Sequence, residues 1–408
     1  MSTPGRNLFA VTAASFIGFM GFTLVMPFLP LYFHQLGVGT VGEVAMWSGL
    51  SLGVTPALTA MLSPFWGRLA DRYGRKIMVE RSLASFVVIM AATAFVTRAW
   101  HVFALRAVQG LFAGYGSLTL TMAADSAPEG RMAQSIGLVQ TAQRLGPALG
   151  PVFGGTLAAV VGLRRAFIVA AVFYAIAVAL VFVLYDERLV HARPEATGTP
   201  QGAITFRNVF AFENFLVMSA AIFGLQFVDR SFGPVLPLYV GLLGVPPTRV
   251  ALISGLLFSI AAGAGALGHH YCAALLRRMP APRLIVFASV LAGSGALVYT
   301  TAHHVYWLYA ATPFFGLAIG AGMTAAYTAA AEVIPPNARG VGFGLLTTAS
   351  LVGLAVSPVV AGFLGAWSIR SVFALDAASL AALGFGVSIA AREIRQEEFP
   401  TPNSQLPT

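Results

Sequence analysis

A lone carboxylate inside a long apolar segment is the feature of this sequence with the clearest chemistry. Asp229 lies in the stretch 212–240, about 16 Å from its end if each residue of a helix advances by roughly 1.5 Å. An ionisable side chain held in hydrocarbon is unfavourable, so it marks a functional site by default. Desolvation opposes its charge and a nearby arginine favours it, so a change of partner could load and release a proton. We predict that Asp229 carries a coupling proton; the alternative is a permanent Asp–Arg pair that holds the segment in place.

Three arginines in apolar segments are the candidate partners of this carboxylate. Arg144 lies near the middle of its segment, and Arg106 lies in another. Arg230 follows Asp229 directly, and adjacent residues of a helix point about 100° apart, so we expect these two side chains not to face each other. The sequence therefore predicts that Asp229 pairs across helices with Arg144 or Arg106. For Arg106 the alternative is a side chain that extends to the membrane surface.

A substrate pocket in a membrane protein would need adaptable apolar side chains and a few polar groups at half the membrane depth. For any single candidate, ordinary packing or lipid contact is the alternative interpretation. His269 and His270 lie near the end of a segment and are interpreted as interfacial, and no Cys/His group has the spacing of a metal site. The candidate pocket residues are Phe19, Met26, Gln140, Arg144, Phe223, Gln226, Phe227, Phe314 and Tyr327.

The segments that must position these residues are membrane helices. The chain of 408 residues is 57% hydrophobic and 10% charged, against roughly 25% charged residues in a soluble domain. Most of its twelve apolar stretches reach the roughly 20 residues that a helix needs to cross the hydrocarbon, where helices satisfy their own backbone groups. We expect an all-α integral membrane protein with twelve transmembrane helices. The stretches are 8–33, 45–69, 77–97, 102–124, 133–160, 165–185, 212–240, 250–275, 283–301, 305–330, 341–366 and 371–390.

The sequence also repeats itself. Pro-x-Leu-Pro-Leu-Tyr occurs at 27–32 and again at 234–239, close to half of the chain length later. Two like halves in a membrane protein favour two pseudo-symmetric six-helix bundles with a site between them. We expect an N-terminal bundle over residues 1–185, a cytoplasmic linker over 186–211, a C-terminal bundle over 212–391 and a cytoplasmic tail over 392–408.

The net charge of +9 has a topological explanation. Most Lys and Arg residues lie between segments on one side, which by the positive-inside rule is the cytoplasm, together with both termini. Nucleic acid is therefore not an expected partner. Lysine is nearly absent beside many arginines, which suggests a GC-rich genome, and we expect the protein in a bacterial inner membrane.

The segment from Gly67 to Lys76 reads G-R-L-A-D-R-Y-G-R-K. This pattern resembles the signature of the major facilitator superfamily after its second helix, which implies the twelve-helix fold of that family. The resemblance also implies a latch that holds the cytoplasmic ends of the two bundles together and favours the outward-open state. The alternative is a basic loop that only sets topology. The latch residues would be Gly67, Asp71, Arg72, Gly74 and Arg75.

Two further motifs carry the same resemblance. Arg106-x-x-Gln109-Gly110 is similar to a superfamily motif associated with proton coupling. A glycine-rich run resembles the motif of the proton-coupled exporters, although a generic tightly packed helix is the alternative; its residues are Gly146, Gly150, Pro151, Gly154 and Gly155. Runs at 24–32 and 46–49 are similar to the MdtG-type exporters of the drug:proton antiporter branch.

These resemblances imply a proton-coupled antiporter that exports amphipathic drugs or other small molecules by alternating access. One alternative keeps the fold and exports a specific metabolite, such as a sugar, a siderophore or an organic anion; another is a sensor that binds solute without moving it. The sequence has no catalytic arrangement and no phosphate-binding loop, so we expect neither enzyme activity nor use of ATP. We expect a small-molecule substrate and the lipid bilayer as partners, the proton as coupling ion without another cofactor, and a monomer.

Overall fold

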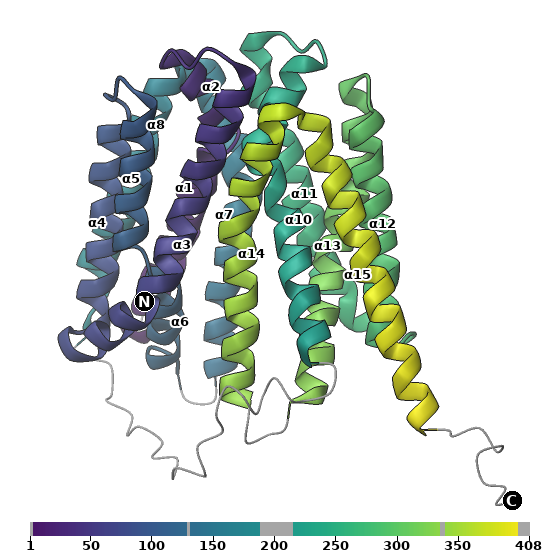
Figure 1. The fold of residues 1–408 in the computed structure, drawn as a ribbon. Coiled ribbons are helices and arrows are strands. Elements are labelled where there is room, and N and C mark those ends of the chain that lie inside the picture. The colour runs from purple at the N-terminus through teal and green to yellow at the C-terminus, as the bar shows by residue number, and fades with distance from the viewer. Residues whose placement is uncertain (1–2, 129–130, 188–214, 335–338, 399–408) are drawn as a thin grey trace, which may run out of the picture.

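The computed structural model describes residues 3–128, 131–187, 215–334 and 339–398, and the regular elements in these ranges are helices (Figure 1). The N-terminal half holds α1 (Thr3–Leu24), α2 (Leu29–Gln35), α3 (Val41–Tyr73), α4 (Arg75–Thr93), α5 (Ala99–Phe112), α6 (Tyr115–Asp125), α7 (Met132–Val161) and α8 (Leu163–Leu184). The C-terminal half holds α10 (Phe215–Leu242), α11 (Pro247–Leu276), α12 (Ala281–Thr301), α13 (Val305–Val333), α14 (Arg339–Trp367) and α15 (Ile369–Glu398).

The helices of the described residues make twelve passes through the molecule, because α1 and α2 together form the first pass and α5 and α6 form the fourth. Ten of the described helices are long and apolar enough to cross a membrane. The predicted all-α fold with twelve membrane helices is therefore confirmed. The boundaries differ at the C-terminus, where α15 continues to Glu398 and the predicted tail thus begins as helix. Most of the predicted linker lies outside the described residues.

The fourth pass is broken between α5 and α6. Gly114 there has φ +122°, a conformation that favours glycine, and the break leaves carbonyl groups at the end of α5 without helical partners. Side chains of neighbouring helices satisfy them. The indole Nε1 of Trp66 donates to the carbonyl of Leu111 at 2.7 Å, and the guanidinium of Arg81 donates to that of Phe112 at 3.0 Å. Arg81 also stacks over the Trp66 ring, 3.3 Å from its centroid.

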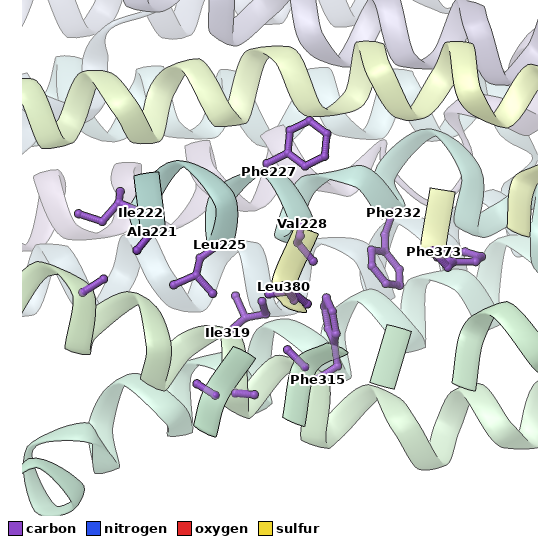
Figure 2. Close-up of a cluster of buried hydrophobic side chains, with 14 of the residues drawn as sticks. Ala221, Ile222, Leu225, Phe227, Val228, Phe232, Phe315, Ile319, Phe373 and Leu380 are labelled. Atoms are coloured by element: carbon purple, nitrogen blue, oxygen red, sulfur yellow. The ribbon is translucent and has the colours of Figure 1, made fainter. Parts of the chain in front are cut away.

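Each half of the chain has its own buried core. One is built from α1 to α8 and the other from α10 to α15, and each takes in a single alanine of the other half. In the C-terminal core, the ring of Phe232 lies 4.8 Å from that of Phe315 and 5.1 Å from that of Phe373. Figure 2 shows these rings on one side of α10, whereas Phe227 points to the other side. The two halves are thus packed bodies that meet along a limited surface.

The halves touch where α3 packs against α14 and α7 against α11. A Cβ added to Gly49 would lie 2.2 Å from the carbonyl oxygen of Pro358, and one added to Gly255 would lie 2.3 Å from that of Pro151. Since no side chain fits there, glycine permits this approach of backbone to backbone. We call this region the closed end; it consists of residues 42–53 of α3, 151–155 of α7, 251–259 of α11 and 355–366 of α14.

At the opposite end the same helices are not in such contact. Gly67 near the end of α3, Gly137 near the start of α7 and Gly344 near the start of α14 have open space where a Cβ would lie. The described chain begins at this end with α1 and finishes there with α15 (Figure 1). We call it the open end. The structure therefore shows one state of the molecule, in which the close glycine contacts between the halves gather at the closed end.

Candidate functional site

A cavity of about 400 Å³ lies between the two halves. Its walls come from both of them, with side chains of α1 and α7 facing side chains of α10, α11, α13 and α14. Four charged or titratable side chains other than tyrosine line it: Arg144, Asp229, Arg230 and His269. The apolar part of the wall includes Phe19, Phe22, Met26, Phe232, Phe258, Phe315, Ile319, Met323 and Leu354. The cavity thus combines an adaptable apolar surface with a small cluster of charges.

Asp229 forms an ion pair with its neighbour in sequence. The Nε of Arg230 lies 3.0 Å from Oδ2 of Asp229, and about a third of each side chain is exposed. The prediction that these two side chains do not face each other was wrong. The Cα–Cβ bonds diverge as expected, but the long arginine side chain reaches back to the carboxylate. Among the described residues, no arginine of another helix pairs with Asp229.

Arg144 and His269 line the same cavity as this carboxylate and come from two other helices. Arg144 on α7 lines the cavity, is exposed, and makes no ion pair with a described residue. His269 on α11 lies near enough to interact electrostatically with both Arg144 and Asp229. Its Nδ1 is 2.7 Å from the hydroxyl of Thr324 on α13. The interpretation of His269 as interfacial was therefore wrong, since the residue belongs to the cavity.

Arg106 does not reach the cavity. Its side chain is buried inside the N-terminal half, where Nη1 donates to Oε1 of Gln109 at 2.8 Å. Its carbonyl accepts a hydrogen bond of 2.8 Å from Thr55 on α3. In this state Arg106 is neither a partner of Asp229 nor a side chain at the membrane surface, and it ties α5 to α3.

Four of the predicted pocket residues line the cavity, namely Phe19, Met26, Arg144 and Gln226, and five do not. Phe314 is 61% exposed on the outer face of α13, where lipid would cover it. Gln140 is exposed on α7 away from the cavity wall. Phe223, Phe227 and Tyr327 pack in or against the C-terminal core. Residues missed by the sequence reasoning include Phe258, on a helix that carried no candidate, and Phe315, which differs from the candidate Phe314 only in helix phase.

The glycine-rich run of α7 has two contact faces. Gly146, Gly150 and Gly154 lie against the backbone of α1, and a Cβ on Gly154 would be 1.8 Å from the carbonyl oxygen of Leu24. Gly155 lies against Ala251 of α11 at the closed end, with a corresponding distance of 2.3 Å. Pro151 meets Gly255 at the same place. The run therefore joins α1 to the contact between the halves.

The predicted latch residues lie at the open end, and Asp71 is exposed there without an ion pair to any described residue. Gly74, at φ +95°, turns the chain between α3 and α4. Arg75 forms an ion pair with Asp125 of α6, and its backbone N–H donates to Oε1 of Glu187 at 2.8 Å. Asp71 and Arg75 thus have different surroundings, although both belong to one motif.

The N-terminal half is further tied together beside this motif. The ammonium of Lys76 donates to the carbonyl of Tyr185 at 2.7 Å. Burial raises the pKa of the Tyr185 hydroxyl to about 12, with smaller contributions from nearby carboxylates. The Tyr185 hydroxyl is thus neutral at physiological pH, and the backbone carbonyl of Tyr185 holds Lys76 at the start of α4.

A second carboxyl in the C-terminal half, Asp376, lies near the end of its segment, which predicts a place near the outer surface, yet the structure buries it. Asp376 on α15 has no exposed surface and accepts a hydrogen bond of 2.6 Å from Ser231 on α10. Its other oxygen has no partner among the described residues. Its position close to the end of a segment gave no sign of this burial, because helix phase decides which face it lies on.

Comparisons with known proteins agree with this architecture. The family model described as Major Facilitator Superfamily matches residues 11–302 and 271–406. Multidrug resistance protein MdtG of Proteus mirabilis (strain HI4320) is 28% identical over 380 residues, which are 91% of this chain and 92% of the relative. MdtG of Salmonella dublin is 32% identical over 287 residues, 70% of each chain. The predicted resemblance to MdtG-type exporters is thereby confirmed.

Among solved structures, a bacterial homolog to the human lysosomal transporter Spinster, in an inward-facing and unoccupied conformation, aligns with a TM-score of 0.74. The alignment covers 96% of both chains at 17% identity, so it shows a common fold. Family model, relatives and fold agree, and the chain belongs to the major facilitator superfamily.

Proposed function

We propose that this transporter exports amphipathic small molecules in exchange for protons. The observation that carries the proposal is the cavity between the halves, where Asp229 pairs with Arg230 and where Arg144 of the opposite half also lines the wall. The names of the relatives, multidrug resistance proteins, support export of foreign compounds. The phenylalanines and methionines of the wall suit cargo of variable shape.

In this proposal the structure corresponds to the state after proton release. Asp229 is paired as a carboxylate with Arg230, and the open end gives substrate access to the cavity. After the molecule opens on the other side, Asp229 takes up a proton, its pair with Arg230 breaks, and the substrate leaves. Proton entry down 100 mV supplies about 2.3 kcal/mol, and each pH unit adds about 1.4 kcal/mol.

A second candidate cargo is an organic anion. Of the charged groups in the cavity, Arg144 and Arg230 are cationic, and Asp229 is the anion. This excess of positive charge favours a negatively charged or zwitterionic substrate over a lipophilic cation. Export of a specific anionic metabolite would then replace the broad drug specificity on the same fold.

The orientation belongs to the same proposal. The open end carries Arg72, Arg75 and Lys76, which supports, by the positive-inside rule, a cytoplasmic side for this end and for both termini in a bacterial inner membrane. One chain supplies both walls of the cavity, which supports a monomer as the working unit. The proton is the coupling ion, and no further cofactor is needed for this cycle.

The proposal is tested with purified protein in vesicles that carry a pH gradient. Uptake of a lipophilic cation, an organic anion and a sugar is compared for the wild type, Asp229→Asn, and Glu332→Gln as a control. Glu332 is an exposed carboxylate on α13 that does not line the cavity. We expect pH-driven transport in the wild type and the control, and transport without coupling, or none, in a well-folded Asp229→Asn. Unchanged pH-driven transport in Asp229→Asn would reject the proton role of this residue. Whether the wild type transports the lipophilic cation or the organic anion better distinguishes the amphipathic drug from the anionic cargo.

A further inference from the structure

His269 is a titratable side chain of the cavity for which the proton cycle above has no use. It belongs to the C-terminal half, yet it interacts with Asp229 of its own half and with Arg144 of the other half. The corresponding position of the N-terminal repeat, counted from the pair Gly49 and Gly255, is Ser63. A histidine is therefore not a requirement of the repeated fold.

The position of this histidine within its own half is fixed. A Cβ added to Gly268 would lie 2.2 Å from the carbonyl oxygen of Leu317, and one added to Gly320 would lie 2.1 Å from that of Gly265. These contacts join α11 closely to α13, and the hydroxyl of Thr324 on α13 lies 2.7 Å from the Nδ1 of His269. The His269 ring is therefore held at a constant place relative to α13.

The charges around His269 differ in how they move. Asp229 and Arg230 lie on α10, in the same half, so their distances to His269 change little when the two halves move as bodies. Arg144 lies on α7, in the other half, so its distance to His269 changes with every such movement. The remaining titratable group of the cavity lining is the hydroxyl of Tyr299, which bonds with Thr312 at 2.5 Å.

This arrangement links the charge of the His269 ring to the relative movement of the two halves. Burial and Arg144 oppose a positive charge on the His269 ring, and Asp229 favours it. When the two halves move relative to each other, the distance to the opposing charge of Arg144 changes and the distance to the favourable charge of Asp229 stays. Histidine is the side chain whose ordinary titration range lies nearest to neutral pH, so a change in these opposing influences loads or unloads a proton.

We propose that His269 is a second proton-binding residue of this cavity, and that the distance to Arg144 links its protonation to the movement of the two halves. The proposal deepens the proton antiport proposed above and rests on it for its consequence in transport. The protonation of His269 itself can be measured without transport. Proton binding here would bring a second positive charge beside Arg230 whenever Arg144 has withdrawn.

The first test is a titration of the histidine rings by NMR on the purified protein between pH 3 and 8. The chain has 7 histidines, so His269→Gln identifies the resonance, and His270→Gln is the matched control, because His270 is exposed and does not line the cavity. We expect one resonance to titrate in the wild type and in His270→Gln and to be missing in His269→Gln. Arg144→Gln should move its midpoint to higher pH by about 0.5 unit or more.

A resonance of His269 that does not titrate, or a midpoint that stays in place in Arg144→Gln, overturns the proposal. If His269→Gln does not fold, the His269 ring is identified as the resonance whose midpoint moves in Arg144→Gln and that persists in His270→Gln. The absence of any such resonance also overturns the proposal.

The second test is the pH dependence of transport in vesicles. We expect His269→Gln to transport with a flattened pH profile and His270→Gln to keep the profile of the wild type; equal profiles for all three proteins contradict the inference.

The proposals for Asp229 and for His269 can fail independently of each other. If Asp229→Asn leaves pH-driven transport unchanged while His269 titrates and responds to Arg144, only the role of Asp229 is lost. If Asp229→Asn uncouples transport and His269 never titrates, only the role of His269 is lost.

Discussion

The hydroxyl of Ser231 donates a hydrogen bond of 2.6 Å to Oδ2 of Asp376, and both side chains are buried between α10 and α15. No cation among the described residues pairs with this carboxyl. An ionised carboxylate in such a place, without a partner charge, is strongly unfavourable. The pair therefore joins two helices of the C-terminal half as a neutral acid and a hydroxyl, one residue away in sequence from Arg230 of the cavity.

Loss of the Ser231 hydroxyl should destabilise the protein. We expect Ser231→Ala to lower the free energy of unfolding by about 1–3 kcal/mol, because Asp376 then keeps no hydrogen-bond donor. Asp376→Asn should be the milder change, since a neutral amide still accepts the bond from Ser231. Thermal unfolding in detergent measures both, and Ser294→Ala is the control because Ser294 is exposed and bonds only within α12. A larger loss for Asp376→Asn than for Ser231→Ala would mean that the carboxyl is charged.

A methyl group at the closed end should push the two halves apart. In Gly49→Ala the new Cβ would clash with the carbonyl oxygen of Pro358, which is backbone and cannot rotate away. We expect longer distances between spin labels placed at Thr156 and Thr248, which lie at this end on opposite halves, and a slower transport cycle. Gly263→Ala on α11 is the control, since open space surrounds that position. Equal label distances in the two variants would show that the closed end tolerates a side chain.

Asp71 and Arg75 should respond differently to substitution. Arg75→Ala removes the ion pair with Asp125 that joins two elements of the N-terminal half, so its melting temperature should fall. Asp71→Asn removes no ion pair with a described residue in this state, so its melting temperature should stay close to that of the wild type while transport slows. Thermal unfolding and vesicle transport on the same preparations check both. If Asp71→Asn transports at the wild-type rate, the latch predicted from the motif has no role in the cycle.

The break in the fourth pass depends on its side-chain donors. Trp66→Phe keeps an aromatic ring beneath Arg81 but removes the donor to the carbonyl of Leu111. We expect a loss of about 1 kcal/mol or more in the free energy of unfolding, measured by thermal unfolding with labels on α5 and α6 to follow their angle. Trp100→Phe, at an exposed position on α5, is the control. A Trp66→Phe protein as stable as the control would show that the break needs no such support.

The sequence was informative where a residue type is rare in its segment. Asp229 and Arg144 stood out because charged side chains are expensive in hydrocarbon, and both line the cavity. The sequence did not show which face of each helix is turned toward the cavity. Phe314 and Phe315 are neighbours in the same apolar segment, yet the first faces outward and the second faces the cavity. The periodicity of a mostly apolar helix does not show which of its faces meets the other half.

Two other differences have simple geometric causes. The argument against an Asp229–Arg230 pair used only the directions of the Cα–Cβ bonds, and a flexible arginine spans the difference. His269 was assigned to the membrane surface because it lies near the end of its segment. The cavity, however, extends toward the open end, so a residue at that depth can face its interior rather than lipid.

The closed end is formed largely by main-chain atoms and small residues, and none of the ion pairs that the structure describes crosses it. Ionic strength should therefore have little effect on how firmly that side is shut, whereas the arginine-rich opposite side should respond to dissolved salt and to the headgroups of the surrounding phospholipids. In the orientation proposed above, a change of salinity outside the cell would leave the outer barrier unaltered, whereas salt and lipid on the inner side would act on the transporter.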